Sequence, residues 1–207
     1  AAIMLGGPYE PESGVRELAA VMRSLGAEHL SAYMLTVSEG TPLADMVRRG
    51  EFSPDDDRSA DLYSAFHEAA AQAGYARYEV SNWALPGKEC RHNIKYWTGG
   101  DYAGLGAGAY SKVGGCRFHT APDANAYVGG NIARITDEVM TEKQLAAEKA
   151  VFGLRTRFGV DKNTLSAAGI DLEKLLKTPY FTFDGNALHI KDEYLLTSDG
   201  IVVKYIL

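Results

Sequence analysis

The chain has 207 residues, of which 46% are hydrophobic and 23% are charged, proportions typical of a globular protein with a buried core. Its formal net charge is −6, and no basic run is longer than Arg48-Arg49. Nucleic-acid binding needs a concentrated basic face, so we do not expect nucleic acid as a partner. No apolar stretch approaches the length of a transmembrane segment.

The cysteines and the first residues bear on the compartment of the protein. Cys90 and Cys116 are far apart and form no Cys-x-x-Cys arrangement, so we expect reduced thiols and neither a disulfide framework nor a Cys-rich metal site. Residues 1–8 lack the regions of a signal peptide. They indicate a buried strand entering a loop, so the chain is expected to begin within a fold. Together these features predict a cytoplasmic protein.

The first hundred residues alternate strand and helix signals. The expected elements are a strand at 3–5, a helix at 11–25, a strand at 30–37, a short helix at 42–49, a helix ending near 73, and a strand at 78–81. Ser53 is the expected cap of the long helix, with Pro54 at its first position. This order predicts right-handed βαβ crossovers and a parallel sheet. The nearly all-apolar strand at 30–37 is typical of a sheet covered on both faces.

The predicted architecture of the first part is an unfinished α/β barrel. Three strands with no closing partner are too few for a barrel, so further strands are expected upstream. We interpret residues 1–120 as the C-terminal part of a βα barrel with an unpaired sheet edge.

The second part of the chain predicts a small module after a glycine-rich middle. Residues 121–140 are expected to be a linker. The expected elements that follow are helices at 141–157, 164–168 and 172–177, a hairpin of 181–183 with 188–190, and a final apolar segment. Helices followed by a small hairpin predict a winged-helix-like domain over residues 141–207.

The segment from Cys90 to Tyr102 is the most informative for function. It contains His92, Asn93, Tyr96 and Trp97 between a Pro-Gly and a Gly-Gly turn, which predicts a displayed loop. Imidazole is a good axial ligand of haem iron, and flat aromatic rings suit a flat macrocycle. Alternatively, the two aromatic rings fill the barrel mouth and the histidine binds a backbone carbonyl, which composition alone favours.

Other polar or glycine-rich positions carry weaker signals. Residues 104–108 read Gly-x-Gly-x-Gly, which permits close approach of a flat ligand or, equally, a tight strand entry. Thr36 and Asn82 are expected at strand ends on the catalytic face of a barrel, or as caps of the next turn. Four isolated histidines receive no role: His29, His67, His119 and His189.

Three segments together resemble the HemN/HemW-type radical S-adenosylmethionine (SAM) family. They are residues 30–42, 78–87 and 91–109, and they occur in the order and spacing of that family. The motif that distinguishes the two branches of the family is His-Asn-x-x-Tyr-Trp at 92–97. It resembles the haem-chaperone branch and differs from the oxidase branch. The resemblance spans essentially the whole chain and is looser in the C-terminal domain.

The resemblance implies a fold, cofactors and site residues. The implied fold is a partial TIM-like radical SAM barrel followed by a HemN-type C-terminal domain. Implied cofactors of the full-length family are a [4Fe-4S] cluster, SAM and haem. Haem is implied at His92, Asn93, Tyr96 and Trp97, with His92 as candidate iron ligand. The positions that match SAM contacts are Thr36, through its backbone, and Tyr110, against the adenosyl group.

The chain departs from the family pattern in two ways. The three-cysteine cluster motif is absent, and Ala2 stands where the family has an aspartate that contacts SAM. We therefore expect a HemW-like haem-binding and haem-transfer protein that lacks the cluster-binding half, through truncation or as an unusual paralogue. Its expected partners are haem and haem-acceptor proteins. The alternatives are an oxygen-independent coproporphyrinogen III oxidase and a degenerate binding module with neither activity.

Overall fold

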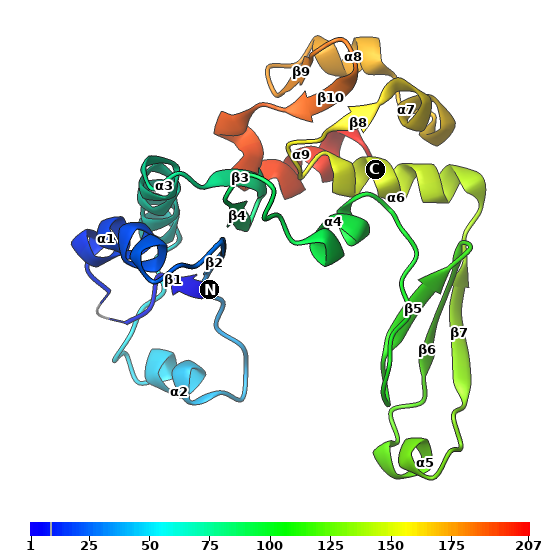
Figure 1. Cartoon of the computed structure of the whole chain (residues 1–207), viewed down its shortest axis with the longest axis horizontal. Helices are drawn as coiled ribbons and strands as arrows, with labels where there is room; N and C mark the ends of the chain where they lie inside the picture. The colour runs from blue at the N-terminus through cyan, green and yellow to red at the C-terminus, as the bar shows by residue number, and fades with distance from the viewer. Residues whose placement is uncertain (9) are drawn as a thin grey trace. The chain divides into compact units, whose positions relative to one another are not determined.

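The structure is a computed structural model that describes residues 1–8 and 10–207. The chain divides into two compact units, Ala1–Cys90 and Arg91–Leu207 (Figure 1). This boundary differs from the sequence-based division into 1–120, 121–140 and 141–207, which stays a prediction. None of the helices in the described part of the chain has the length and apolar character that crossing a bilayer requires.

Unit 1 is a four-stranded sheet with three helices, and every strand and helix expected before residue 82 is present. Its elements are β1 (Ala2–Leu5), α1 (Glu12–Ser24), β2 (His29–Met34), α2 (Pro42–Arg48), α3 (Asp56–Gln72), β3 (Ala76–Glu79) and β4 (Asn82–Ala84). The strand order is β1-β2-β4-β3. The chain therefore has the mixed α/β architecture that the sequence predicts.

The expectation of a wholly parallel sheet is wrong beyond the first pair. β1 and β2 are parallel, but β4 lies between β2 and β3 and is antiparallel to both. The chain reverses directly after β3, and the carboxylate of Glu79 accepts hydrogen bonds from the backbone N–H of Ser81 and the amide of Asn82. Asn82 is thus buried as the first residue of β4 and is not exposed at the end of the preceding strand.

One face of this sheet is covered within unit 1. Leu5 and Leu30 are fully buried, and α3 packs on β1, β2 and β3 while α1 packs on α3. Met4 and Tyr33, which alternate with the buried residues, are exposed. Within unit 1 the second face of the sheet is therefore not covered at these positions, although the apolar strand at 30–37 is typical of a sheet covered on both faces.

The start of α3 also differs from the expectation. Asp55, and not Ser53, is the N-cap, and its carboxylate accepts the backbone N–H of Arg58 at 2.9 Å. A carboxylate satisfies a free N–H and also interacts favourably with the positive end of the helix dipole. The helix therefore begins two residues later than it would with Ser53 as its N-cap.

Unit 2 contains two antiparallel three-stranded sheets and several helices. Its elements are α4 (Arg91–Trp97), β5 (Tyr110–Val113), β6 (Cys116–Thr120), α5 (Ala124–Val128), β7 (Arg134–Val139), α6 (Glu142–Gly153), β8 (Val160–Asp161), α7 (Lys162–Ala168), α8 (Leu172–Leu176), β9 (Phe181–Phe183), β10 (Ala187–Ile190), a 3₁₀ helix (Asp192–Thr197) and α9 (Ser198–Tyr205). The sheet orders are β5-β6-β7 and β8-β10-β9.

The β5-β6-β7 sheet was not predicted from the sequence. Residues 121–140, expected to be a linker, contain α5 and β7. Gly114 and Gly115 have φ values of 57° and 81°, so they form the two-residue turn that joins β5 to β6. Figure 1 shows this sheet extending away from α6, with α5 beyond its far end.

The C-terminal part has the predicted winged-helix-like order of helices and hairpin. α6 packs on α7, and β9 pairs with β10 in the expected hairpin. α6 ends at Gly153, four residues before the expected end, because the chain there turns toward β8. Leu154, Leu165 and Leu188 are almost fully buried in this domain.

Replacing Thr141 tests how much the start of α6 contributes to unit 2. Thr141 and Gln144 form a capping box, in which each side chain hydrogen-bonds the backbone N–H of the other residue. Thr141→Ala is expected to lower the free energy of unfolding by about 1 kcal/mol. The measurement is urea denaturation followed by circular dichroism. Thr141→Ser keeps the hydroxyl and is the matched control, so equal losses in both variants would contradict this role.

Candidate functional site

The His-Asn-x-x-Tyr-Trp motif lies on a helix, so the prediction of a displayed loop is wrong. α4 ends because Gly99 adopts a left-handed conformation with φ 74°. The backbone N–H of Gly99 donates to the Tyr96 carbonyl at 3.1 Å, and that of Gly100 donates to the Lys95 carbonyl at 2.8 Å. This pattern is a Schellman cap, so the Gly-Gly pair is the signal that ends the helix.

The helix divides the motif into two pairs with four-residue spacing. His92 and Tyr96 lie on one side of α4, and their rings meet edge to face with centroids 4.9 Å apart. Tyr96 in turn contacts Tyr102, with ring centroids 4.5 Å apart. His92 is exposed, and neither of its ring nitrogens forms a hydrogen bond with any residue that the structure describes. The expected alternative, a bond from His92 to a backbone carbonyl, is therefore not present among these residues.

The second pair, Asn93 and Trp97, lies on the neighbouring side of α4. Asn93 is half-buried. Trp97 packs against Phe152 of α6 with ring centroids 5.8 Å apart, and the Arg155 guanidinium lies over the indole at 5.5 Å. Trp97 therefore attaches α4 to α6, while the His92 side remains open to solvent.

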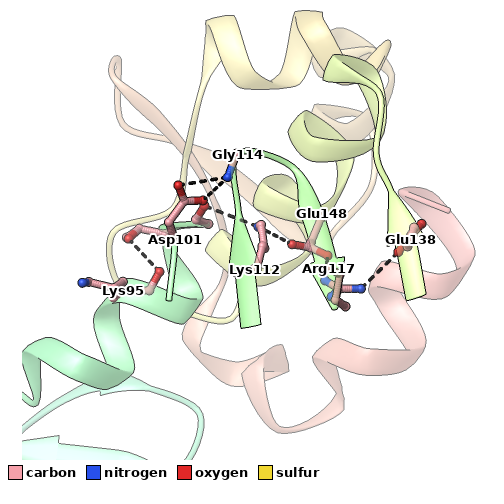
Figure 2. Close-up of polar contacts among 9 residues, drawn as sticks. Lys95, Asp101, Lys112, Gly114, Arg117, Glu138 and Glu148 are labelled. Atoms are coloured by element: carbon pink, nitrogen blue, oxygen red, sulfur yellow. Dashed lines mark hydrogen bonds and ion pairs between the residues drawn. The ribbon is translucent and has the colours of Figure 1, made fainter. Parts of the chain in front are cut away.

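A buried ion network joins the β5-β6-β7 sheet to α6 (Figure 2). Lys112 of β5 is only 4% exposed, and its ammonium lies 2.6 Å from Oε1 of Glu148 on α6. Arg117 of β6 donates to the other oxygen of the same carboxylate and also pairs with Glu138 of β7. One carboxylate thus compensates a buried ammonium and a half-buried guanidinium.

The same network holds the segment that follows α4. Lys112 donates to the Gly99 carbonyl at 3.4 Å, and its backbone exchanges two hydrogen bonds with Tyr102 at 2.8 and 2.9 Å. The Asp101 carboxylate accepts the backbone N–H of Gly114 at 3.1 Å, as Figure 2 shows. The end of α4 is therefore fixed to β5 at several points. Sequence reasoning missed Lys112, Arg117 and Glu148, because nothing local in the sequence signals their pairing.

The pKa of Glu148 reflects this network. Burial by itself would raise the pKa, but the hydrogen bonds and charges of Lys112 and Arg117 outweigh it, so the pKa lies below its ordinary value of 4.5. The ionised carboxylate is thus the form that the folded state favours.

The two positions that match SAM contacts lie in different units. Thr36 follows β2 in unit 1 and is exposed, whereas Tyr110 lies in β5 of unit 2. A SAM site at these residues stays a prediction. Gly104 favours the strand-entry interpretation of the glycine-rich segment, because a Cβ there would lie 2.2 Å from the Tyr110 carbonyl oxygen.

The four histidines that seemed isolated in the sequence have partners in space. His29 and His67 hydrogen-bond Tyr78 and Trp83, and His189 lies 3.2 Å from the Asp184 carboxylate. Nδ1 of His119 lies 2.9 Å from both carboxylate oxygens of Asp137. The absence of neighbouring motif residues in the sequence therefore did not indicate spatial isolation.

The donor set of the chain does not fit an iron–sulfur cluster. Cys90 and Cys116 are both free, and the [4Fe-4S] cluster that the sequence resemblance implies needs three thiolates. Within residues 1–8 and 10–207, no group of three or more His, Cys, Asp or Glu side chains is arranged to hold a metal ion.

Comparison with known proteins identifies close similarity to one group. The chain is 35% identical over 207 residues to "Heme chaperone HemW" of Mycobacterium tuberculosis, covering 97% of the chain and 53% of that protein. It is 30% identical over 191 residues to "Heme chaperone HemW" of Lactococcus lactis, covering 86% of the chain and 50% of that protein. The chain thus spans about half the length of these relatives, and the match falls in their C-terminal half. No family model matches the chain.

A solved structure has the same fold. Coproporphyrinogen III oxidase (HemN) from Escherichia coli, described as a radical SAM enzyme, superposes with a TM-score of 0.71. The match covers 99% of the chain and 54% of that structure, at 14% sequence identity. At this identity the likeness shows the fold alone, and the fold is the predicted C-terminal portion of a radical SAM protein followed by its C-terminal domain.

Replacing Glu148 tests the buried network. Glu148→Gln leaves the Lys112 ammonium buried without a countercharge, and we expect the free energy of unfolding at pH 7 to fall by about 3 kcal/mol. The folded-state pKa of Glu148 is lowered, so the ionised carboxylate contributes fully to the free energy of unfolding above about pH 4.5. This contribution is lost as the pH falls below that value. Urea denaturation at pH 7 and below pH 4.5 measures both effects.

The matched control is Glu138→Gln, which removes an exposed partner of Arg117. This change is expected to cost less than 1 kcal/mol, as do most solvent-exposed ion pairs. Equal losses of unfolding free energy in the two variants would contradict the network. So would a difference in unfolding free energy between the parent and Glu148→Gln that stays the same below pH 4.5.

Proposed function

Because this chain belongs to the HemN/HemW family of radical SAM proteins, as a segment that spans about half the length of its relatives, we propose that it is the haem-binding part of a HemW-like haem-transfer protein. The observation that carries this proposal is the exposed side chain of His92 on the solvent-facing side of α4. Neither of its ring nitrogens forms a hydrogen bond with a described residue. A neutral imidazole of this kind can donate its lone pair to haem iron.

The other residues of the motif have distinct proposed parts. Tyr96 supports the imidazole edge to face and offers a flat ring to a porphyrin. Trp97 is directed toward α6, so its contribution is to fix the position of α4. Asn93, which is half-buried beside Trp97, is proposed to line the same site through its amide.

The motif on α4 favours haem transfer over the alternative of oxidative decarboxylation, because His-Asn-x-x-Tyr-Trp at 92–97 resembles the haem-chaperone branch and differs from the oxidase branch. The [4Fe-4S] cluster is implied for the full-length family as a whole, so the cysteines of this chain do not decide between the two. If a cluster-binding segment is present elsewhere, Thr36 and Tyr110 are the residues of this chain that would contact SAM. The proposed partners are haem and a protein that accepts it, and the free cysteines fit a cytoplasmic setting.

Replacing His92 tests the proposed haem site. His92→Ala is expected to weaken haem binding at this site by tenfold or more and to shift the Soret band, because the iron loses an axial nitrogen. The fold is expected to survive, since the side chain is exposed. The measurement is a haemin titration followed by absorbance, with circular dichroism as a check of folding.

The matched control is His189→Ala in the same unit, where the imidazole already pairs with Asp184. Unchanged haem affinity and spectra in His92→Ala would contradict the proposal, as would an equal effect in His189→Ala.

A separate measurement concerns the cluster. Anaerobic reconstitution of the chain with iron and sulfide is expected to leave it colourless, because two cysteines cannot supply three thiolates to one cluster. A brown absorbance in stoichiometric amount that disappears in the variant Cys90→Ser/Cys116→Ser would show that the chain holds a cluster.

A further inference from the structure

His119 of β6 has the geometry of an oriented metal ligand. Its Nδ1 lies 2.9 Å from both oxygens of the Asp137 carboxylate on β7. The carboxylate accepts a hydrogen bond from Nδ1–H, so the lone pair of the neutral ring is on Nε2. Nε2 has no hydrogen-bond partner among the described residues and is not a buried atom. A histidine held by a carboxylate at one nitrogen and open at the other is the usual arrangement of a metal-binding imidazole.

The surroundings of His119 are flat and apolar. Tyr110 pairs with His119 across β5 and β6, and the two rings stack with centroids 5.0 Å apart and planes 29° apart. Ile135 of β7 pairs with His119 on the other side. Paired residues of an antiparallel sheet project from the same face, so the three side chains form one row. Tyr110 is 56% exposed and Ile135 is 44% exposed, which leaves apolar surface on both sides of the imidazole.

This row borders the surface that begins at α4. Tyr102 pairs with Lys112, and Lys112 pairs with Arg117, so these residues form the neighbouring row of the same sheet face. Tyr102 contacts Tyr96, and Tyr96 contacts His92. The two rows are roughly 7 Å apart along the strand, since each residue advances about 3.4 Å. The ring contacts of His92 lead to Tyr96 and Tyr102, whereas the ring contact of His119 leads to Tyr110 in the other row.

The donor count indicates which metal species His119 can hold. A bare metal ion needs several protein ligands, and the described residues form no group of three donors. Haem iron already has four porphyrin nitrogens and needs one axial ligand. One oriented imidazole between two exposed apolar side chains therefore fits haem better than a free ion.

We propose that His119, held by Asp137 and flanked by Tyr110 and Ile135, is the axial ligand of a second haem position, separate from that of His92. This inference rests on the proposed function, because it assumes that the chain takes up haem. Tyr110 is also the proposed contact of the adenosyl group, so haem at His119 and SAM at Tyr110 would bind alternatively and not together. Two positions along one surface would give a transfer protein a receiving and a delivering site.

Variants of the whole chain test the second position. The set is His92→Ala, His119→Ala, the double variant, Asp137→Asn and the control His189→Ala, each titrated with haemin. His189 is a close match, because it also pairs with a carboxylate and its side chain is 20% exposed against 18% for His119. Stoichiometry, the Soret band and the electron paramagnetic resonance signal of imidazole-ligated iron are measured for each.

The expected results separate the two positions. The parent and the control His189→Ala bind two haems, His92→Ala and His119→Ala each bind one imidazole-ligated haem, and the double variant binds none in that form. Asp137→Asn keeps the imidazole but loses its orientation, so haem at His119 weakens about 10-fold to 100-fold, and Asp137→Glu restores part of this loss. Zinc or nickel without porphyrin is expected not to bind at His119.

Three outcomes would overturn the second position. If His119→Ala has the stoichiometry and spectra of the parent while His92→Ala loses haem, the second position is wrong and the proposed function stands. If the parent binds no haem, both proposals fail. If zinc or nickel alone binds and His119→Ala abolishes this binding, His119 belongs to a metal-ion site and not to a haem position.

Discussion

The ion pair between Lys112 and Glu148 is the interaction on which the candidate site depends. A buried ammonium is stable only beside a carboxylate, so β5 and α6 must remain together. The same ammonium reaches the Gly99 carbonyl, and the same strand residue pairs with Tyr102. Because Gly99 ends α4 and Tyr102 contacts Tyr96, one buried charge pair fixes the end of the motif helix, the start of the sheet and the helix beneath them.

This support explains how a short helix can present the side chain of the proposed haem ligand, His92. Seven residues form too short a helix to be stable alone in water, so α4 depends on its packing. Trp97 supplies that packing on α6, and the glycine cap supplies a defined end. The side of α4 that carries His92 and Tyr96 is then free to bind a ligand without loss of stability. Within one motif, Trp97 therefore has a structural role, and the proposed ligand-binding residues lie on a different side of the helix.

The antiparallel sheet of β5, β6 and β7 carries the proposed second haem position of unit 2. Its bulge at Arg117 and Phe118 places both Asp137 and Glu138 near the same face, so one carboxylate holds His119 and the next pairs with Arg117. The face therefore combines a charged row next to α6 with an aromatic and apolar row farther along the strands. A ligand that has a flat apolar body and one metal centre matches the second row.

The sequence by itself determined the local elements of the fold and the motif, but tertiary structure decided the site. Apolar periodicity and caps predicted β1, α1, β2, α3 and the hairpin of β9 and β10, because these signals act over a few residues. The Gly99 cap was also readable, although we interpreted the Gly-Gly pair as a turn at the end of a displayed loop. The partners of Lys112 and His119 could not be read, since Glu148 is 36 residues away and Asp137 is 18 residues away. Such pairs form only when strand register and helix packing bring distant residues together, so burial and orientation of these groups are properties of the folded chain.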